Sequence, residues 1–224
     1  MFNDFFEAED NQYAEEIFNR LNQISDQWER TAVQETRDYN DPFRTLIASM
    51  LSARTREEDT RIATNNLFER AKTPAEMVQL SDTEIAVCIQ MVTYHESKVN
   101  YIRRTCETLV NEHDGNVPQD LESLEALHGI GWKTAVLTQW IAFGIAEEIC
   151  VDVHVRRIGK RLGLVQPKTE KPQQVSVELM QRVPKHLWGA WNPLMVRFGK
   201  EICYFNTPAC KACPLNDICP KIGV

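Results

Sequence analysis

The chain of 224 residues contains only nine glycines and ten prolines, too few for a fibrous or low-complexity protein. It also lacks a long apolar run. The longest nearly apolar stretch, residues 135–146, is about half a membrane span and includes Thr138 and Gln139. The first residues, MFNDFFEAED, are acidic and lack the basic region of a signal peptide. These absences predict a soluble, cytoplasmic protein with no membrane partner.

A two-residue alternation of apolar and polar side chains is not sustained anywhere, which argues against β-sheet, whereas helical signals recur. Thr73 precedes Pro74 at a helix start, and Ser81 and Glu84 form a capping box. An apolar helix is expected over residues 132–145, and further helices over residues 153–162 and 187–203. The sequence therefore predicts an all-α protein.

Charge is distributed unevenly along the chain. The net charge is −7, and residues 1–45 carry all of that excess, with eleven acids and four bases. Residues 153–171 have a local excess of five positive charges, from the basic side chains Arg156, Arg157, Lys160, Arg161, Lys168 and Lys171 against Glu170. Such a run is either a solvated helix face or a nucleic-acid contact, and local fields matter more than the total charge.

Four cysteines close the chain with the spacing C-x6-C-x2-C-x5-C: Cys203, Cys210, Cys213 and Cys219. Disulfides are not expected without secretion. Four thiolates can hold a structural zinc ion, although zinc sites usually have two separated C-x2-C pairs. One short loop that supplies four thiolates favours a [4Fe-4S] cluster. The remaining cysteines, Cys88, Cys106 and Cys150, lie in apolar or helical contexts and are expected to be buried thiols.

A Gly-Ile-Gly turn at residues 129–131 separates two expected helices. Its exposed amides would favour an anion such as a DNA phosphate, but a plain helix–helix connection is the alternative. Lys133 follows at the start of an apolar helix, where it either snorkels to solvent or projects as a functional amine. The positive helix end and partial burial would both favour the neutral amine that Schiff-base chemistry requires.

The segment Val151-Asp152-Val153-His154-Val155 lies between this apolar helix and the basic run. Asp152 either caps the next helix or acts as a carboxylate that stabilises positive charge on a sugar.

Together the segment LHGIGWKTA, the segment VDVHV and the cysteine tail resemble the endonuclease III branch of the helix–hairpin–helix DNA glycosylases, over residues 41–219. The resemblance implies a two-lobed all-α fold. A six-helix bundle over residues 36–145 would end in the helix–hairpin–helix. Residues 1–35 and 146–224 would form a discontinuous helical domain, with a [4Fe-4S] cluster in the loop 203–219. Double-stranded DNA would bind between the lobes.

The resemblance also implies a bifunctional DNA glycosylase/AP lyase of base excision repair. Its substrate would be double-stranded DNA with oxidised pyrimidines, such as thymine glycol, or with abasic sites. Lys133 would attack C1′ of the damaged nucleotide, expel the base and form a Schiff base, and β-elimination would nick the strand. Asp152 would support the positive charge on the sugar and help to activate the amine. The target base must leave the helix to be reached.

The resemblance further implies a set of DNA contacts. The Gly129 and Gly131 amides would hold a phosphate beside the flipped nucleotide, Arg54 and Tyr94 would fill the vacated stack, and His154 would face DNA. For Arg54 and Tyr94 the alternative is ordinary packing, and for His154 a capped, solvent-facing position. The remaining expected contacts are phosphate contacts that do not read sequence: Arg157, Lys160 and Arg161, with Lys200 and Lys211.

Several residues depart from the family pattern. His128 stands where a proline is usual, and Trp132, Arg54, Tyr94 and His95 also differ. A second hypothesis is therefore a damaged-DNA-binding iron–sulfur protein with weak or altered glycosylase activity, directed at mismatched bases or oxidised purines. For either function we expect a monomer, associated with the nucleoid if the source is bacterial.

Overall fold

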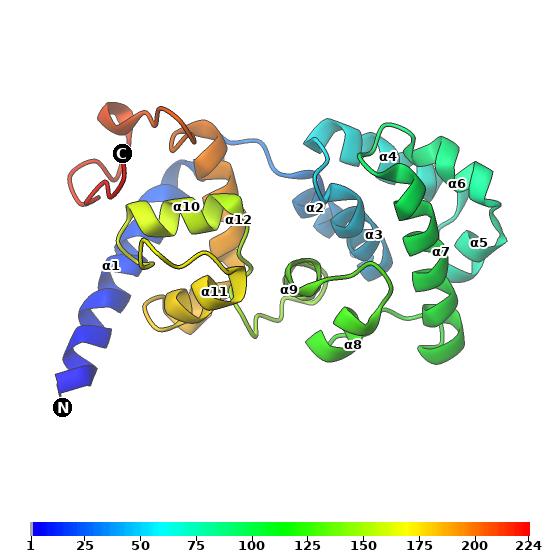
Figure 1. The fold of residues 1–224 in the computed structure, drawn as a ribbon, viewed down its shortest axis with the longest axis horizontal. Helices are drawn as coiled ribbons and strands as arrows, with labels where there is room; N and C mark the ends of the chain where they lie inside the picture. The colour runs from blue at the N-terminus through cyan, green and yellow to red at the C-terminus, as the bar shows by residue number, and fades with distance from the viewer. Residues whose placement is uncertain (1) are drawn as a thin grey trace. The chain divides into compact units, whose positions relative to one another are not determined.

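A computed structural model describes the backbone of residues 2–224 and the side chains of residues 11–224. Every regular element in this described part is a helix, twelve of them α-helices and three 3-10 helices, with no strand (Figure 1). The prediction of an all-α protein is confirmed. None of the helices in the described part is long and apolar enough to cross a membrane.

The chain divides into two compact units. We call the continuous one, Thr31–Ile145, the hairpin unit. The other, which we call the cysteine unit, combines the chain up to Arg30 with Ala146–Val224. The cysteine unit is therefore assembled from the two ends of the described chain.

Local sequence signals explain where helices of the hairpin unit begin. The Asp41 side chain accepts hydrogen bonds from the amides of Phe43 and Arg44 at the start of the third α-helix. The expected cap at Thr73 and the capping box at Ser81 are both present. The elements are α2 Ala32–Glu35, η1 Thr36–Tyr39, α3 Pro42–Ser52, α4 Glu57–Arg70, α5 Pro74–Gln79, α6 Asp82–Ile89, α7 His95–Glu112, α8 Leu121–Ala126 and α9 Trp132–Phe143.

One hydrophobic core fills the hairpin unit. Helix α3 lies at its centre, with seven consecutive buried residues from Thr45 to Leu51, and packs against α4 and α9. Side chains from α4 to α9, including Leu67 and Ile102, close the core around it. This packing fixes the ends of the helices. Three candidate residues, Arg54, Gly129 and Gly131, lie in the loops that join those ends.

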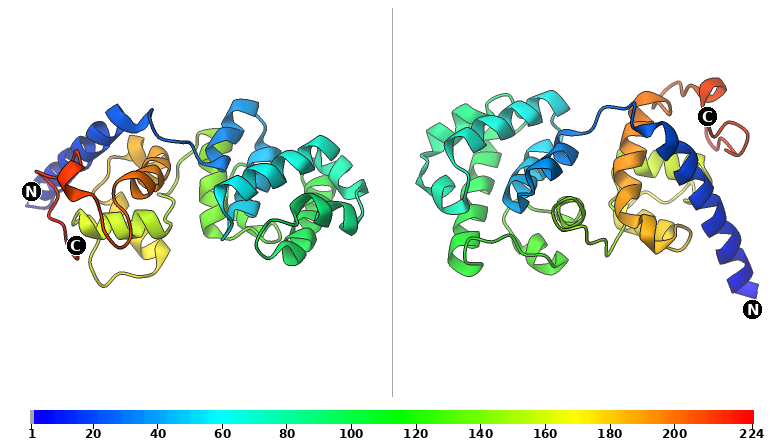
Figure 2. Two further views of the ribbon diagram at one scale, coloured as in Figure 1. Left: turned by 90° about the horizontal axis from the view of Figure 1, so that it is seen from above. Right: turned by 180° about the vertical axis from the view of Figure 1, so that it is seen from behind.

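The cysteine unit is built around the long first helix. Its elements are α1 Phe2–Ser25, α10 Val153–Arg161, α11 Pro172–Met180, η2 Lys185–Leu187, α12 Trp188–Glu201 and η3 Cys210–Ala212. Helix α1 runs alongside α12 (Figure 2), and the rings of Phe18 and Trp191 stack with centroids 6.4 Å apart. The Tyr13 hydroxyl reaches the carbonyl oxygens of Leu162 and Ile218 at 3.2 and 3.3 Å, so α1 is bonded to the C-terminal segment.

Candidate active site and cysteine loop

The glycine turn of the hairpin unit joins α8 to α9 and depends on the absence of a side chain at residue 129. Gly129 has φ +80°, and a Cβ atom there would lie 2.5 Å from Cγ of Tyr101 on α7. Leu127 and Ile130, on either side, are buried, and the Ile130 amide donates to the Leu127 carbonyl at 3.1 Å. The turn therefore lies directly on α7, where only glycine fits.

Two further contacts hold the turn against α7. The Thr105 hydroxyl donates to the carbonyl oxygen of His128 at 2.7 Å. The His128 ring meets the Tyr101 ring edge to face, with centroids 5.3 Å apart. The histidine that departs from the family pattern thus packs against the same tyrosine as the glycine.

The turn presents backbone amides and an amine to solvent. Gly129 and Gly131 are exposed, and within the described residues neither amide donates a hydrogen bond. Gly131 is the N-cap of α9, and Lys133 is the second residue of that helix. The positive end of the helix lies here, which favours a bound anion. Lys133 is exposed, so the expected partial burial of its side chain is not found.

In the cysteine unit, Asp152 caps the N-terminus of α10. Its Oδ1 atom accepts hydrogen bonds from the amides of His154 and Val155, both at 2.9 Å. The carboxylate is half-buried, and Oδ2 makes no hydrogen bond within the described residues. The capping alternative is thus correct, and it leaves one carboxylate oxygen for a second role.

His154 is half-buried, so it is not the fully solvent-facing residue of the alternative, and its contact with DNA stays a prediction. Its Nδ1 atom lies 3.2 Å from Nη2 of Arg157. A Cβ atom at Gly199 on α12 would come within 2.4 Å of the same Nδ1. The ring is therefore packed between α10 and α12.

The four basic residues of α10 form two rows, each with a spacing of four residues. Arg157 and Arg161 form one row and face the cysteine loop. Arg161 is only 8% exposed, and its guanidinium donates to Sγ of Cys203 at 3.3 Å and to the carbonyls of Tyr204 and Phe205 at 2.6 and 2.7 Å. Arg157 donates to the Cys203 carbonyl at 2.8 Å. These internal bonds and the burial of Arg161 weaken the expectation that it contacts a DNA phosphate.

Arg156 and Lys160 form the second row and pair with one carboxylate. Glu170 accepts from Lys160 at 2.5 Å and lies 3.0 Å from Arg156. The hydrogen bond from Lys160 lowers the pKa of Glu170. These cations are thus bonded within the unit, which weakens the expectation that Lys160 and Arg157 serve as phosphate contacts, although the excess of positive charge in the segment is unchanged.

Two residues expected to face DNA, Arg54 and Tyr94, lie together at one end of the hairpin unit. Arg54 follows α3 and Tyr94 is the N-cap of α7. Nη1 of Arg54 donates to the Tyr94 hydroxyl at 3.4 Å. Both residues have φ +58°, which is uncommon without glycine. Both side chains are exposed, Tyr94 by 60%. The structure therefore brings these two candidates together.

The sequence reading missed Lys98, which lies beneath this pair and is only 4% exposed. Its Nζ donates to the carbonyl oxygens of Leu51 and Ala53 at 2.7 and 2.9 Å and lies 3.3 Å from the Thr55 hydroxyl. Burial lowers the pKa of Lys98 to about 8. The signal was its position on the apolar stripe of α7, one turn before Ile102.

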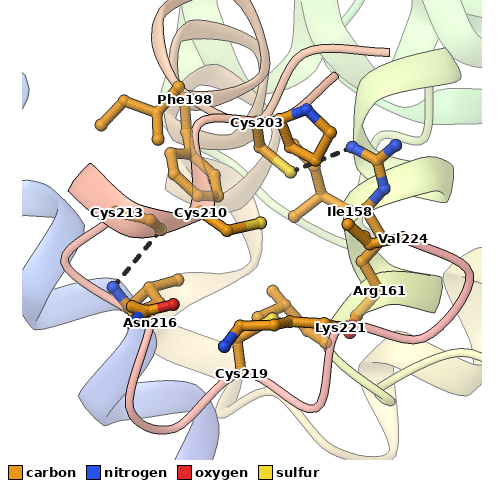
Figure 3. A pocket seen from close by; sticks show the side chains of 14 residues that line it. Ile158, Arg161, Phe198, Cys203, Cys210, Cys213, Asn216, Cys219, Lys221 and Val224 are labelled. Atoms are coloured by element: carbon orange, nitrogen blue, oxygen red, sulfur yellow. Dashed lines mark hydrogen bonds between the residues drawn. The ribbon is translucent and has the colours of Figure 1, made fainter. Parts of the chain in front are cut away.

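The four C-terminal cysteines line one cavity between α10, α12 and the loop itself, with apolar walls that include Phe198 and Leu215 (Figure 3). Within the described residues, no group of three or more His, Cys, Asp or Glu converges on a single metal ion. Four thiols spread around one cavity fit the corners of a [4Fe-4S] cluster.

The surroundings of these thiols also fit a bound cation. Burial raises the pKa of Cys213 to about 11 and raises that of Cys219, so a metal is needed to hold them as thiolates. The Leu215 amide and the Arg161 guanidinium already donate to Sγ of Cys213 and Cys203. The remaining cysteines, Cys88, Cys106 and Cys150, are buried, as expected.

Comparison with known proteins places this geometry among DNA repair proteins. Residues 47–185 match the model of the HhH-GPD superfamily base excision DNA repair protein. The chain is 38% identical to endonuclease III of Thermotoga maritima, over 80% of this chain and 83% of that protein. It is 34% identical to endonuclease III-like protein 1 of Bos taurus, of which it spans only 58%.

Two solved structures of endonuclease III with DNA are also similar. A non-covalent complex gives a TM-score of 0.75 at 33% identity and covers 81% of this chain and 84% of that one. A trapped covalent intermediate gives 0.77 at 29% identity, over 93% and 96% of the two chains. A thermostable thymine-DNA glycosylase, at 19% identity and a TM-score of 0.77, shares the fold.

Proposed function

The chain belongs to the endonuclease III branch of the HhH-GPD superfamily of base excision DNA repair proteins, and from this premise we propose that it removes oxidised pyrimidines from duplex DNA through Lys133. Its activity is that of a DNA glycosylase/AP lyase. The preferred lesions would be those of the thymine glycol class, and abasic sites would be cleaved as well.

The observation that carries the proposal is the position of Lys133. The amine lies exposed on the first turn of α9, immediately after a turn whose two glycine amides also face solvent. Those amides suit a phosphate of the target strand. A nucleotide held there by its backbone would bring its sugar near the amine. This arrangement favours chemistry at the sugar rather than simple binding.

The reaction requires Lys133 as a neutral amine. Its nitrogen bonds to C1′ while the glycosidic bond breaks, and the base leaves with the bonding electron pair and takes up a proton. The nitrogen then loses one proton, and the bond between C1′ and the ring oxygen breaks as that oxygen takes up a proton, which leaves a protonated Schiff base. Removal of a C2′ proton expels the 3′ phosphate by β-elimination and nicks the strand. The base must first be flipped out of the duplex.

Asp152 would serve the same reaction from the cysteine unit. Oδ1 is held by two amides of α10, which fixes the orientation of the carboxylate, and Oδ2 is the oxygen available to act. A fixed negative charge stabilises positive charge that develops on the sugar.

The duplex would be held by several residues. The amides of Gly129 and Gly131 would bind the phosphate, and Arg54 and Tyr94 would occupy the space left by the flipped base. Lys211, an exposed cation of the cysteine loop, is a better candidate for a phosphate contact than the internally bonded Arg157, Lys160 and Arg161, and Lys200 is exposed as well.

The cysteine loop would hold a [4Fe-4S] cluster through Cys203, Cys210, Cys213 and Cys219. When bound, the cluster would order a loop that has little core of its own. The described fold of this loop relies on polar contacts from α10, chiefly from Arg161. We assign the cluster no step in the reaction.

One copy of the chain carries both Lys133 and Asp152, so the proposal requires no second subunit and we expect a monomer. A DNA substrate would place it in the cytoplasm, associated with the nucleoid if the source is bacterial.

Borohydride trapping tests the proposal. Duplexes carrying an abasic site, thymine glycol or undamaged thymine are incubated with the protein and reduced. We expect a covalent adduct with the first two duplexes and none with the third. Lys133→Gln should abolish the adduct while DNA binding is kept. Lys72→Gln, at an exposed lysine of the same unit, is the matched control and should trap normally.

The other outcomes are informative as well. An adduct with the abasic duplex alone would leave a lyase without pyrimidine removal, and mismatched and oxidised purine substrates would then be compared. No adduct from a cluster-loaded, DNA-binding protein would overturn the role of Lys133 and favour a damage-binding function.

A further inference from the structure

Lys98 is a buried cation whose hydrogen bonds all go to one short segment. Its Nζ bonds to the carbonyls of Leu51 and Ala53 and reaches the Thr55 hydroxyl. These three residues surround Arg54 in the chain. The carbonyls belong to the last turn of α3 and to its C-cap, groups that the helix leaves without partners of its own.

The segment held by Lys98 is a turn of unusual conformation. Arg54 has φ +58°, and the Thr55 amide closes the turn on the Ser52 carbonyl at 3.1 Å. A non-glycine residue keeps such a backbone only where the surroundings enforce it. Lys98 supplies bonds immediately before and after Arg54, so it fixes the direction in which that side chain leaves the turn.

Lys98 is also bonded to the second turn. Its own amide donates to the carbonyl oxygen of Tyr94 at 3.1 Å, as part of the first turn of α7. Tyr94 likewise has φ +58°. Above Lys98, the Arg54 guanidinium donates to the Tyr94 hydroxyl and lies 5.9 Å from its ring centroid. The Lys98 side chain therefore bonds the turn that carries Arg54, while the backbone of the same residue closes the helical turn that follows Tyr94.

We propose that Lys98 is a positioning residue that holds Arg54 and Tyr94 as one preassembled reader of the strand opposite the lesion. The inference rests on the proposed function, since it assumes that this pair meets the duplex. A pair already in contact loses little conformational freedom when it enters DNA. The guanidinium would then bond the unpaired base while the tyrosine ring stacks on its neighbour.

Capping of α3 alone would not need a buried amine. Burial of an ammonium group is unfavourable, and burial lowers the pKa of Lys98 to about 8. When the Lys98 amine is charged, its three N–H groups can donate to the two carbonyls and the Thr55 hydroxyl. When it is neutral, it can donate to the carbonyls and accept from the hydroxyl. The buried Lys98 side chain therefore fixes the backbone geometry of the turn that carries Arg54.

A double-mutant cycle in DNA binding tests this assignment. The probe is a duplex with an uncleavable tetrahydrofuran abasic analogue opposite 2-aminopurine, and both Kd and the fluorescence change are measured. Lys98→Met and Arg54→Ala should each weaken binding about tenfold, and the double variant should also lose about tenfold rather than a hundredfold, because both act through one side chain. Ile102→Val, one turn further along α7, controls for loss of core packing and should bind normally.

Thr55→Val provides a second variant in case Lys98→Met does not fold. It removes one contact of Lys98 and should give a smaller loss, again without further effect when Arg54 is already alanine. A multiplicative loss in either double variant would overturn the proposal. Normal binding by folded Lys98→Met would overturn it too, as would a wild-type protein with no preference for the abasic analogue.

Borohydride trapping on an abasic duplex at saturating protein separates this inference from the proposed function. The wild-type protein should trap on this duplex, because Lys133 is present. Normal trapping without coupling between Lys98 and Arg54 would remove only the positioning role. Coupled binding without any wild-type adduct would remove only the lyase.

Discussion

Gly129 lies so close to Tyr101 that a Cβ atom on the glycine would be 2.5 Å from Cγ of the ring. The contact packs the glycine turn against α7 and so fixes the position of the first turn of α9, which follows it. It therefore links the packing of a core helix to the position of the proposed nucleophile.

Gly129→Ala should destabilise the hairpin unit by about 2–4 kcal/mol, because the new methyl group overlaps Tyr101 and the positive φ adds strain. Urea unfolding measures the change. Gly115→Ala is the control, with φ +77° but nothing within 4 Å of its Cβ, and should cost about 1 kcal/mol. Equal losses of unfolding free energy at the two sites would show that the Tyr101 ring moves away from the new methyl group without cost.

Substitution can separate the helix-capping role of Asp152 from its proposed role in catalysis. Asn caps helices about as well as Asp, so Asp152→Asn should keep the stability of the cysteine unit, whereas Asp152→Ala should lose about 1 kcal/mol. Both variants lack the carboxylate and should lower the rate of base removal about a hundredfold. Single-turnover kinetics and thermal unfolding measure these effects. Wild-type rates in Asp152→Asn would confine the residue to capping.

Arg161 should matter for the cysteine loop and not for DNA affinity. Arg161→Gln leaves the Tyr204 and Phe205 carbonyls without their donor, so iron content and Tm should both fall. The two lost hydrogen bonds imply a destabilisation of about 1–3 kcal/mol. The slope of DNA affinity against salt should stay unchanged. Lys160→Gln, in the other row of α10, should leave the iron content normal. If Arg161→Gln reduces the slope of DNA affinity against salt, Arg161 does contact a DNA phosphate.

Lys98 should make stability depend on pH in the alkaline range. Its pKa is about 8 in the folded protein against the ordinary value of 10.5, so between these values the unfolded chain holds a proton that the folded protein has lost. Raising the pH then favours folding, and the stability of wild type relative to Lys98→Met should grow by about 2–3 kcal/mol from pH 8 to 10.5. Comparison with the variant cancels titration elsewhere, including the raised pKa of Tyr13. A constant difference would contradict the shift.

Local sequence rules located the helix caps, the glycine turn and the cysteine spacing, because each depends on residues a few positions apart. The partners of the α10 cations were not accessible in this way. Arg157 and Arg161 point to carbonyls more than 40 positions away, and only the packed fold decides which row of a helix faces them. From the sequence alone, the basic run 153–171 therefore suggested a DNA-binding surface.

The burial of Lys98 could not be predicted from the sequence for a related reason. A lysine is normally read as a surface residue, and its place on an apolar stripe shows only when α7 is packed. The carbonyls that satisfy it belong to α3, whose end could not be located to the residue from sequence. The exposed Lys133 shows the opposite case, since the apolar sequence of α9 suggested burial that the first turn of the helix does not provide.

The cysteine unit also has a consequence for synthesis of the protein. Tyr13 and the carbonyl of Ile218 that it reaches are 205 positions apart, so at about 5–20 residues per second α1 waits roughly 10–40 s for this partner. The hairpin unit is continuous and can close during that interval. Until α12 emerges, the apolar face of α1 lacks its cover, so a nascent chain interrupted before that point would expose this face to chaperones and proteases.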